Sequence, residues 1–105
     1  MVFLLETLGC EVVAAEDADT GLDMLERDGQ IELLVSDIVL PGDRNGIQLA
    51  QEATRRRPRL KVILVSGYPE GTLERVGWTE SAFQLVSKPF SIEAFSKALN
   101  AAMAR

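Results

Sequence analysis

The stretch LLVSDIVLPG, residues 33–42, decides the fold of this chain. Its apolar run without alternating polar residues is typical of a strand that is buried on both faces of a parallel sheet. The run ends in one carboxylate, Asp37, and Pro41 follows in a turn. Ligands and reacting groups gather at the carboxyl ends of the strands in such sheets, so Asp37 is the first candidate site residue.

Three further apolar runs alternate with stretches of helical period. We predict strands at 11–15, 32–36, 61–66 and 83–86, and helices at 18–28, 46–57 and 91–104. Ser91 is the expected N-cap of the last helix. Residues 70–81 have a poor apolar stripe and predict at most a short helix. The alternation predicts an α/β fold with a parallel sheet.

Length and composition restrict the function. The 105 residues, 47% of them hydrophobic, predict one domain that spans 1–105 and buries its own core. The net charge of -5 argues against a nucleic-acid partner. No apolar run is long enough to span a membrane and no secretory leader is visible, so we expect no membrane partner and a cytoplasmic location. The absence of histidine excludes Ser-His-Asp and Cys-His chemistry.

Three polar side chains follow three of the predicted strands. Asp37, Ser66 and Lys88 each come at or just after a carboxyl end. Each alone has an ordinary explanation as a cap, a turn or a solvated loop. Together they match what phosphoryl transfer to a carboxylate requires. Asp37 would be the nucleophile, Lys88 would offset negative charge on the phosphoryl oxygens, and Ser66 would donate a hydrogen bond to one of them.

The motifs LVSDIVLPGDRNG, VILVSGYPE and LVSKPF resemble those of response-regulator receiver domains of two-component signalling, most of all receivers of hybrid histidine kinases. The resemblance implies a flavodoxin-like doubly wound parallel sheet. It also implies that Asp37 accepts a phosphoryl group from a histidine kinase or phosphotransfer protein, with Ser66 and Lys88 binding that group. Pro41 and the Asn45-Gly46 turn match the family's loop. The Lys88-Pro89 bond is implied to be cis.

One departure from the family concerns its metal site. Receivers begin with an apolar strand that ends in an acidic pair, which holds Mg²⁺, and this chain has no such segment. MVFLLETLG, residues 1–9, matches instead the second half of the family's first helix, and we predict a helix that ends at Gly9. The alternative is that VFLLE pairs as an antiparallel strand, since the link to residue 11 is too short for a parallel crossover. Asp37 and the Val39 carbonyl alone remain as metal ligands. We therefore expect an incomplete Mg²⁺ site and weak or no phosphorylation of this polypeptide.

The missing strand also matters for the sheet, because in the family it lies between the strands that match 11–15 and 32–36. Its absence leaves four strands with two unpaired neighbours, or a sheet that is completed or rearranged. Missing upstream residues, a homodimer or another association is expected to compensate.

Two smaller features are Leu85 and the arginine-rich stretch at 55–59. Leu85 stands where many receivers have an aromatic ring that moves with the residue at the Ser66 position, so Ser66 and Leu85 are the switch candidates. The simpler interpretation of Leu85 is a packed strand residue, with Phe83 or Tyr68 filling the space. RRRPR, residues 55–59, is interpreted as a solvent-facing helix end that complements the helix dipole.

Three functions remain open. The first is a phosphoacceptor receiver, and the second is a degenerate or truncated receiver that serves only as an interaction and dimerisation module. The third, a hydrolase with a carboxylate nucleophile, is the weakest because no second acidic group near Asp37 can act as general acid or base. We expect a protein that is not an enzyme.

Overall fold

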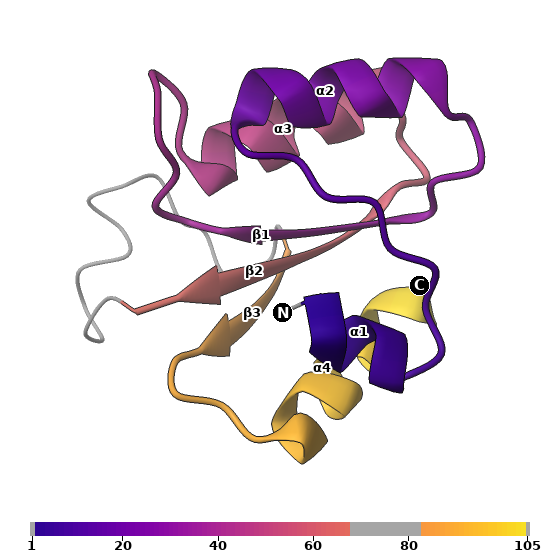
Figure 1. Cartoon of the computed structure of the whole chain (residues 1–105), viewed down its shortest axis with the longest axis vertical. Coiled ribbons are helices and arrows are strands. Elements are labelled where there is room, and N and C mark those ends of the chain that lie inside the picture. Colours follow the sequence, from indigo (N-terminus) through magenta and orange to yellow (C-terminus); the bar gives the residue numbers. More distant parts are fainter. Residues whose placement is uncertain (1, 68–82, 105) are drawn as a thin grey trace.

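The structure is a computed structural model that describes residues 2–67 and 83–104. Its elements are α1 (Val2–Thr7), α2 (Ala18–Arg27), β1 (Leu33–Asp37), α3 (Gly46–Arg56), β2 (Lys61–Ser66), β3 (Gln84–Ser87) and α4 (Ile92–Met103). The predicted short helix at 70–81 and the candidate ring of Tyr68 lie outside the described residues. The strands form a parallel sheet in the order β1-β2-β3 (Figure 1).

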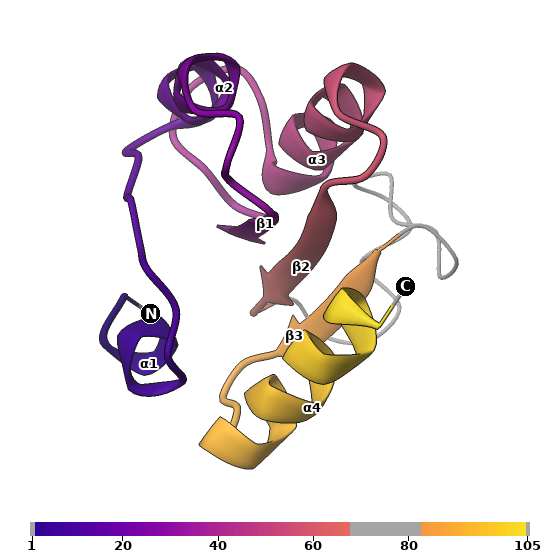
Figure 2. The same cartoon turned by 90° about the vertical axis from the view of Figure 1, so that its right-hand side faces the viewer.

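Helices cover both faces of this sheet, which confirms the predicted doubly wound α/β architecture. In Figure 2, α2 and α3 lie on one side of the strands, and α1 and α4 lie on the other. Phe95 of α4 and Leu5 of α1 pack with Ile63 of β2 in one buried cluster. Leu22 of α2 and Leu49 of α3 belong to a second cluster, and Val62 and Leu64 of β2 pack with Ile47 of α3 in a third. The middle strand, β2, is therefore buried on both faces, as its continuous apolar run indicated.

The helix starts are set by polar caps. Ser91 Oγ accepts a hydrogen bond from Ala94 N at 3.0 Å, so the predicted cap of α4 is confirmed. Asp17 caps α2 in the same way through Thr20 N. Asn45 and Gln48 form a capping box at the start of α3. The latter two caps follow standard sequence signals, and they place α2 and α3 within one or two residues of the prediction.

The predicted strand at 11–15 is wrong. These residues run as an extended link between α1 and α2 (Figure 2) but make no strand pairing, and Val13 is 63% exposed. The apolar sequence EVVAA favours a strand, but a strand persists only when its backbone groups find a partner. The described sheet accordingly has three strands rather than four. The segment before it is helical, as predicted, and Gly9 follows α1 with φ +90°.

The arginines at the end of α3 differ from their sequence interpretation. Arg55 and Arg56 bond to the carboxylate of Glu52 on the helix surface, as expected of a solvated helix end. Arg57 instead reaches the connection between α2 and β1. Its guanidinium donates hydrogen bonds to the carbonyls of Leu25, Asp28, Gly29 and Ile31. The expectation that this whole stretch faces solvent is therefore wrong for Arg57.

The Glu52 cluster predicts an acid-dependent contribution to stability. Hydrogen bonds from Arg55 and then Arg56 lower the pKa of Glu52 from 4.5 to about 2. A carboxyl whose folded pKa is lowered stabilises the fold above its unfolded pKa and loses that contribution as the pH falls through the folded value. We expect Glu52→Gln to unfold at a lower urea concentration than wild type at pH 7. The difference between the two urea midpoints should close as the pH falls from 4.5 to 2. A gap that stays constant over this window would contradict the assignment.

None of the helices in the described part of the chain has the length and apolarity needed to cross a bilayer.

Candidate functional site

Asp37 and Lys88 meet at the carboxyl edge of the sheet. Asp37 is the last residue of β1, and Lys88 directly follows β3. Lys88 Nζ lies 2.8 Å from Asp37 Oδ1, and the two side chains are 50% and 48% exposed. An ion pair this open to water contributes only about 0–1 kcal/mol to stability. Its value is positional, because it holds a cation beside a carboxylate oxygen that can react.

Ser66 enters the site through its backbone. It ends β2, between the strands that carry Asp37 and Lys88, and pairs in register with Ser87. Its carbonyl accepts a hydrogen bond from Lys88 N at 2.7 Å. The residue is 1% exposed, whereas Asp37 and Lys88 are half exposed. The structure thus brings all three predicted residues to one edge, and it adds a backbone contact that sequence reasoning did not foresee.

The residues that shape this edge follow the predicted pattern. The Lys88-Pro89 peptide bond is cis, as the resemblance implied. Pro41 is exposed in the loop after β1, and Gly42 behind it has φ +94°. Such a backbone angle is strained for residues with a side chain, so this glycine fits the turn.

Gly46 has a role that the sequence did not reveal. Its N–H donates to the Ile38 carbonyl at 2.7 Å, which ties the start of α3 to the chain just after Asp37. A Cβ on residue 46 would stand 2.0 Å from the Asp37 carbonyl oxygen. The sequence suggested only a turn at Asn45-Gly46. A close approach between residues nine positions apart leaves no local signal, so only the structure identifies Gly46 as the residue that lets α3 approach Asp37.

The switch candidate Leu85 is packed within the sheet. It pairs in register with Leu64 and, like Phe83, contacts the buried cluster that includes Ile38 and Ile47. This placement agrees with the simpler interpretation of a packed strand residue, and Phe83 lies in the same cluster as anticipated. A switching role for Ser66 and Leu85 stays a prediction.

The donor set for Mg²⁺ does not fit the ion well. Mg²⁺ prefers six oxygens in an octahedral arrangement, with one or two carboxylates. In residues 2–67 and 83–104, no group of three or more acidic, cysteine or histidine side chains lies close enough to hold a metal. Asp37 has one oxygen committed to Lys88. The Val39 carbonyl could add a ligand in the same loop, but the set of described side chains falls short of a cluster that holds the ion.

Comparisons with known proteins show a consistent similarity to receiver domains. The sequence profile of the family described as "Response regulator receiver domain" matches residues 1–100. The chain is 32% identical over 90 residues to sensor kinase CckA of Brucella abortus (strain 2308), a match that covers 85% of this chain and only 9% of CckA. It is 29% identical over 92 residues to the response regulator receiver protein CpdR of the same organism, covering 88% of this chain and 75% of CpdR.

A solved structure is similar over nearly the whole chain. A response regulator receiver domain protein from Clostridium thermocellum superimposes with a TM-score of 0.82 at 29% identity, covering 98% of this chain and 82% of that one.

Proposed function

Because the chain belongs to the response regulator receiver domain family, we propose that Asp37 is the phosphoacceptor of a two-component phosphorelay. The observation that carries this proposal is the 2.8 Å contact between Asp37 Oδ1 and Lys88 Nζ at the carboxyl edge of the sheet. A half-exposed carboxylate beside a cation is accessible to a phosphoryl donor, and its partner can stabilise the charge that arrives.

The transfer is a displacement at phosphorus. A carboxylate oxygen of Asp37 attacks the phosphoryl group of a phosphohistidine, the new O–P bond forms, and the P–N bond breaks with its electron pair going to the imidazole. Lys88 offsets the added negative charge on the phosphoryl oxygens, and Ser66 donates a hydrogen bond to one of them. The chain is consumed as an acceptor in this step and so acts as a signalling component rather than an enzyme.

The histidine that donates the phosphoryl group must lie outside this sequence, because the sequence contains no histidine. A histidine kinase or a phosphotransfer protein of the cytoplasm meets this requirement. The similarity to a segment of a sensor kinase supports a receiver that works with, or is attached to, a kinase. The net charge of -5 favours a protein partner over nucleic acid.

A second candidate function is a receiver that only binds partners. The specific observation in its favour is that the described residues form no group of three or more acidic, cysteine or histidine side chains able to hold a metal ion. Such a domain would keep the fold and its contact surfaces without efficient phosphorylation.

Incubation with acetyl phosphate distinguishes the two candidates. We expect slow, incomplete addition of one phosphoryl group, read by intact mass, because Lys88 is in place but the donor set for Mg²⁺ is short. For the same reason, replacing Mg²⁺ with EDTA is expected to change the rate little. Asp37→Asn should abolish the addition. Asp43→Asn, which removes a charge from the same exposed loop, should leave it unchanged.

Equal labelling of Asp37→Asn and wild type would overturn the assignment of the phosphoacceptor. Complete absence of labelling in wild type and in Asp43→Asn would favour the interaction module. Fast, stoichiometric labelling that needs Mg²⁺ would show that the chain binds the metal better than its described carboxylates indicate.

A further inference from the structure

Ser36 places a buried hydroxyl directly before the candidate acceptor Asp37. It is the only buried residue of β1, with 7% of its surface exposed, and the strand residues before it are apolar. A hydroxyl in such a place costs free energy unless it finds a hydrogen-bond partner. Ser36 Oγ finds one in the Asp37 carbonyl oxygen, to which it donates at 2.8 Å.

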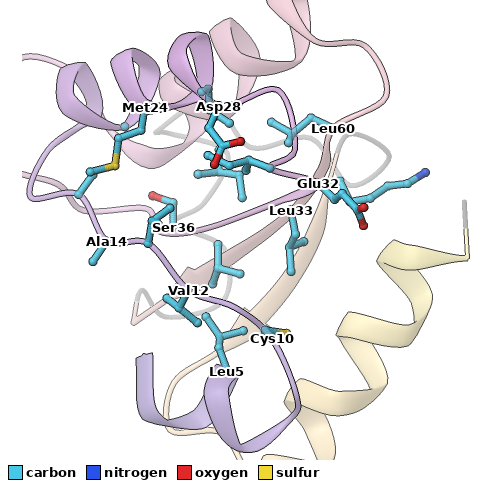
Figure 3. A pocket seen from close by; sticks show the side chains of 18 of the residues that line it. Leu5, Cys10, Val12, Ala14, Met24, Asp28, Glu32, Leu33, Ser36 and Leu60 are labelled. Atoms are coloured by element: carbon cyan, nitrogen blue, oxygen red, sulfur yellow. The ribbon is translucent and has the colours of Figure 1, made fainter.

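The surroundings of Ser36 do not account for a polar side chain. Side chains alternate along a strand, so Ser36 shares a face of the sheet with Leu34 and Ile38, which pack in the cluster beneath α3. Its register partner Leu64 belongs to the same cluster. Figure 3 shows the Ser36 side chain directed toward the side of the sheet where α2 and Met24 lie. Packing alone would favour an apolar residue at position 36.

The hydroxyl contact holds the peptide group that follows Asp37. The carbonyl of this group accepts from Ser36 Oγ, and its N–H, on Ile38, donates to the Val65 carbonyl at 3.0 Å. Gly46 lies against the same carbonyl, since a Cβ there would stand 2.0 Å from the oxygen. A peptide group is planar, so contacts at both of its ends fix its orientation. That orientation sets the direction in which the Asp37 side chain leaves the backbone.

The direction of the Asp37 side chain in turn decides its contact with Lys88. The two side chains meet at 2.8 Å, but both are half exposed, and an ion pair so open to water is too weak to hold its own geometry. The backbone has to hold it from both sides. Lys88 N donates to the Ser66 carbonyl at 2.7 Å, and Ser36 holds the peptide group on the Asp37 side.

We propose that Ser36 is a positioning residue, whose hydroxyl orients the Asp37 carboxylate toward Lys88 and toward the incoming phosphoryl group. This proposal rests on the proposed function, because it concerns the same acceptor carboxylate. Ser36 acts through the backbone of Asp37. The loss of one hydrogen bond of this type corresponds to about a threefold to tenfold change in rate.

Ser36→Thr and Ser36→Val form a matched pair, because threonine and valine have the same shape and differ in the hydroxyl. Both are β-branched and suit a strand. Ser36 borders a cavity of about 1670 Å³, which leaves space for the added methyl group. At saturating acetyl phosphate, we expect phosphoryl addition to be about three to ten times slower in Ser36→Val and within about twofold of wild type in Ser36→Thr. The concentration for half-maximal rate should stay unchanged, because the hydroxyl orients the nucleophile rather than binding the donor.

Carbon chemical shifts report the same geometry without any phosphorylation. The Ile38 amide correlates with the Asp37 carbonyl carbon in a triple-resonance spectrum, and this carbon moves upfield when its oxygen loses a hydrogen-bond donor. We expect the upfield shift in Ser36→Val, together with a changed shift of the Asp37 carboxyl carbon as it moves away from Lys88. Ser36→Thr should reproduce the wild-type position of both signals.

Thr54→Val controls for a general loss of stability. Thr54 Oγ1 donates to the Ala50 carbonyl at 2.8 Å, which is a hydroxyl-to-carbonyl contact of the same kind. It lies in α3, about two turns beyond Gly46. We expect Thr54→Val to leave both the phosphorylation rate and the two Asp37 carbon signals unchanged. Circular dichroism checks folding, and Ser36→Ala, which lacks the hydroxyl and adds no atom, replaces Ser36→Val if that variant does not fold.

The outcomes separate this proposal from the one on which it rests. Equal rates and equal carbon shifts in Ser36→Val and Ser36→Thr would overturn the role of Ser36. Shifted carbons in Ser36→Val with an unchanged rate would overturn it as well, because the orientation would then not matter for transfer. A wild-type chain that is not labelled at all overturns the phosphoacceptor proposal alone, and the carbon shifts then decide whether Ser36 orients Asp37 toward Lys88.

Discussion

Gly46→Ala is expected to destabilise the fold by about 3 kcal/mol, at the upper end of the range for overpacked sites. The added Cβ would stand 2.0 Å from the Asp37 carbonyl oxygen and 2.8 Å from its carbonyl carbon. Both are backbone atoms, so no rotation of a side chain can relieve the contact. Either α3 moves away from β1 or the end of β1 shifts. The urea midpoint at constant m-value measures the loss.

Gly21→Ala is the matched control. Gly21 lies within α2, where a Cβ would meet its nearest neighbours at 3.8 Å and 4.0 Å, which is ordinary contact. Alanine there should stabilise the chain by about 0.5–1 kcal/mol, because glycine in a helix loses more backbone freedom on folding. Equal midpoints for the two variants would show that α3 does not approach Asp37 as closely as the structure indicates.

Gly46→Ala also links the packing of α3 against β1 to the geometry of Asp37 and Lys88. A shift of the β1 end in Gly46→Ala would separate Asp37 from Lys88. We expect phosphoryl addition from acetyl phosphate to fall in Gly46→Ala, at temperatures where the variant is still folded, and to be unchanged in Gly21→Ala.

Arg57→Ala is expected to cost about 3 kcal/mol of stability, which corresponds to one or two charge-assisted hydrogen bonds. The guanidinium contacts four carbonyls between Leu25 and Ile31. These carbonyls belong to the end of α2 and the turn that leads into β1. Without Arg57, the partly buried ones lose a donor that water replaces incompletely.

Two further variants, Arg57→Lys and Arg59→Ala, show whether hydrogen-bond geometry or charge explains the stability lost in Arg57→Ala. Lysine keeps the charge but has no planar fork of donors, so it should recover only a minor part of the loss. Arg59 is exposed two residues later, and its replacement by alanine should change stability by no more than about 0.5 kcal/mol. Recovery of full stability in Arg57→Lys would mean that charge, rather than the fork of hydrogen bonds, holds the turn.

The sequence predicted well those elements whose formation depends on the pattern of residues within the element itself. The helices at 18–28, 46–57 and 91–104 were found within one or two residues, because their apolar stripes and capping side chains act within a single turn. The strands that end at Asp37 and Ser66 were found because a continuous apolar run needs cover on both faces. Parallel pairing then brought Asp37, Ser66 and Lys88 to one edge, as the strand order required.

The sequence by itself thus determined the α/β class, the order of the elements and the residues delivered to the carboxyl edge of the sheet. Only the tertiary structure decided that residues 11–15 stay unpaired, that Gly46 touches the Asp37 backbone, and that Arg57 holds the turn before β1. The physical reason is the same in each case. Helix periods and caps act between neighbouring residues, whereas strand pairing, close backbone approach and clamping of a distant turn depend on partners that are brought near only by the folded chain.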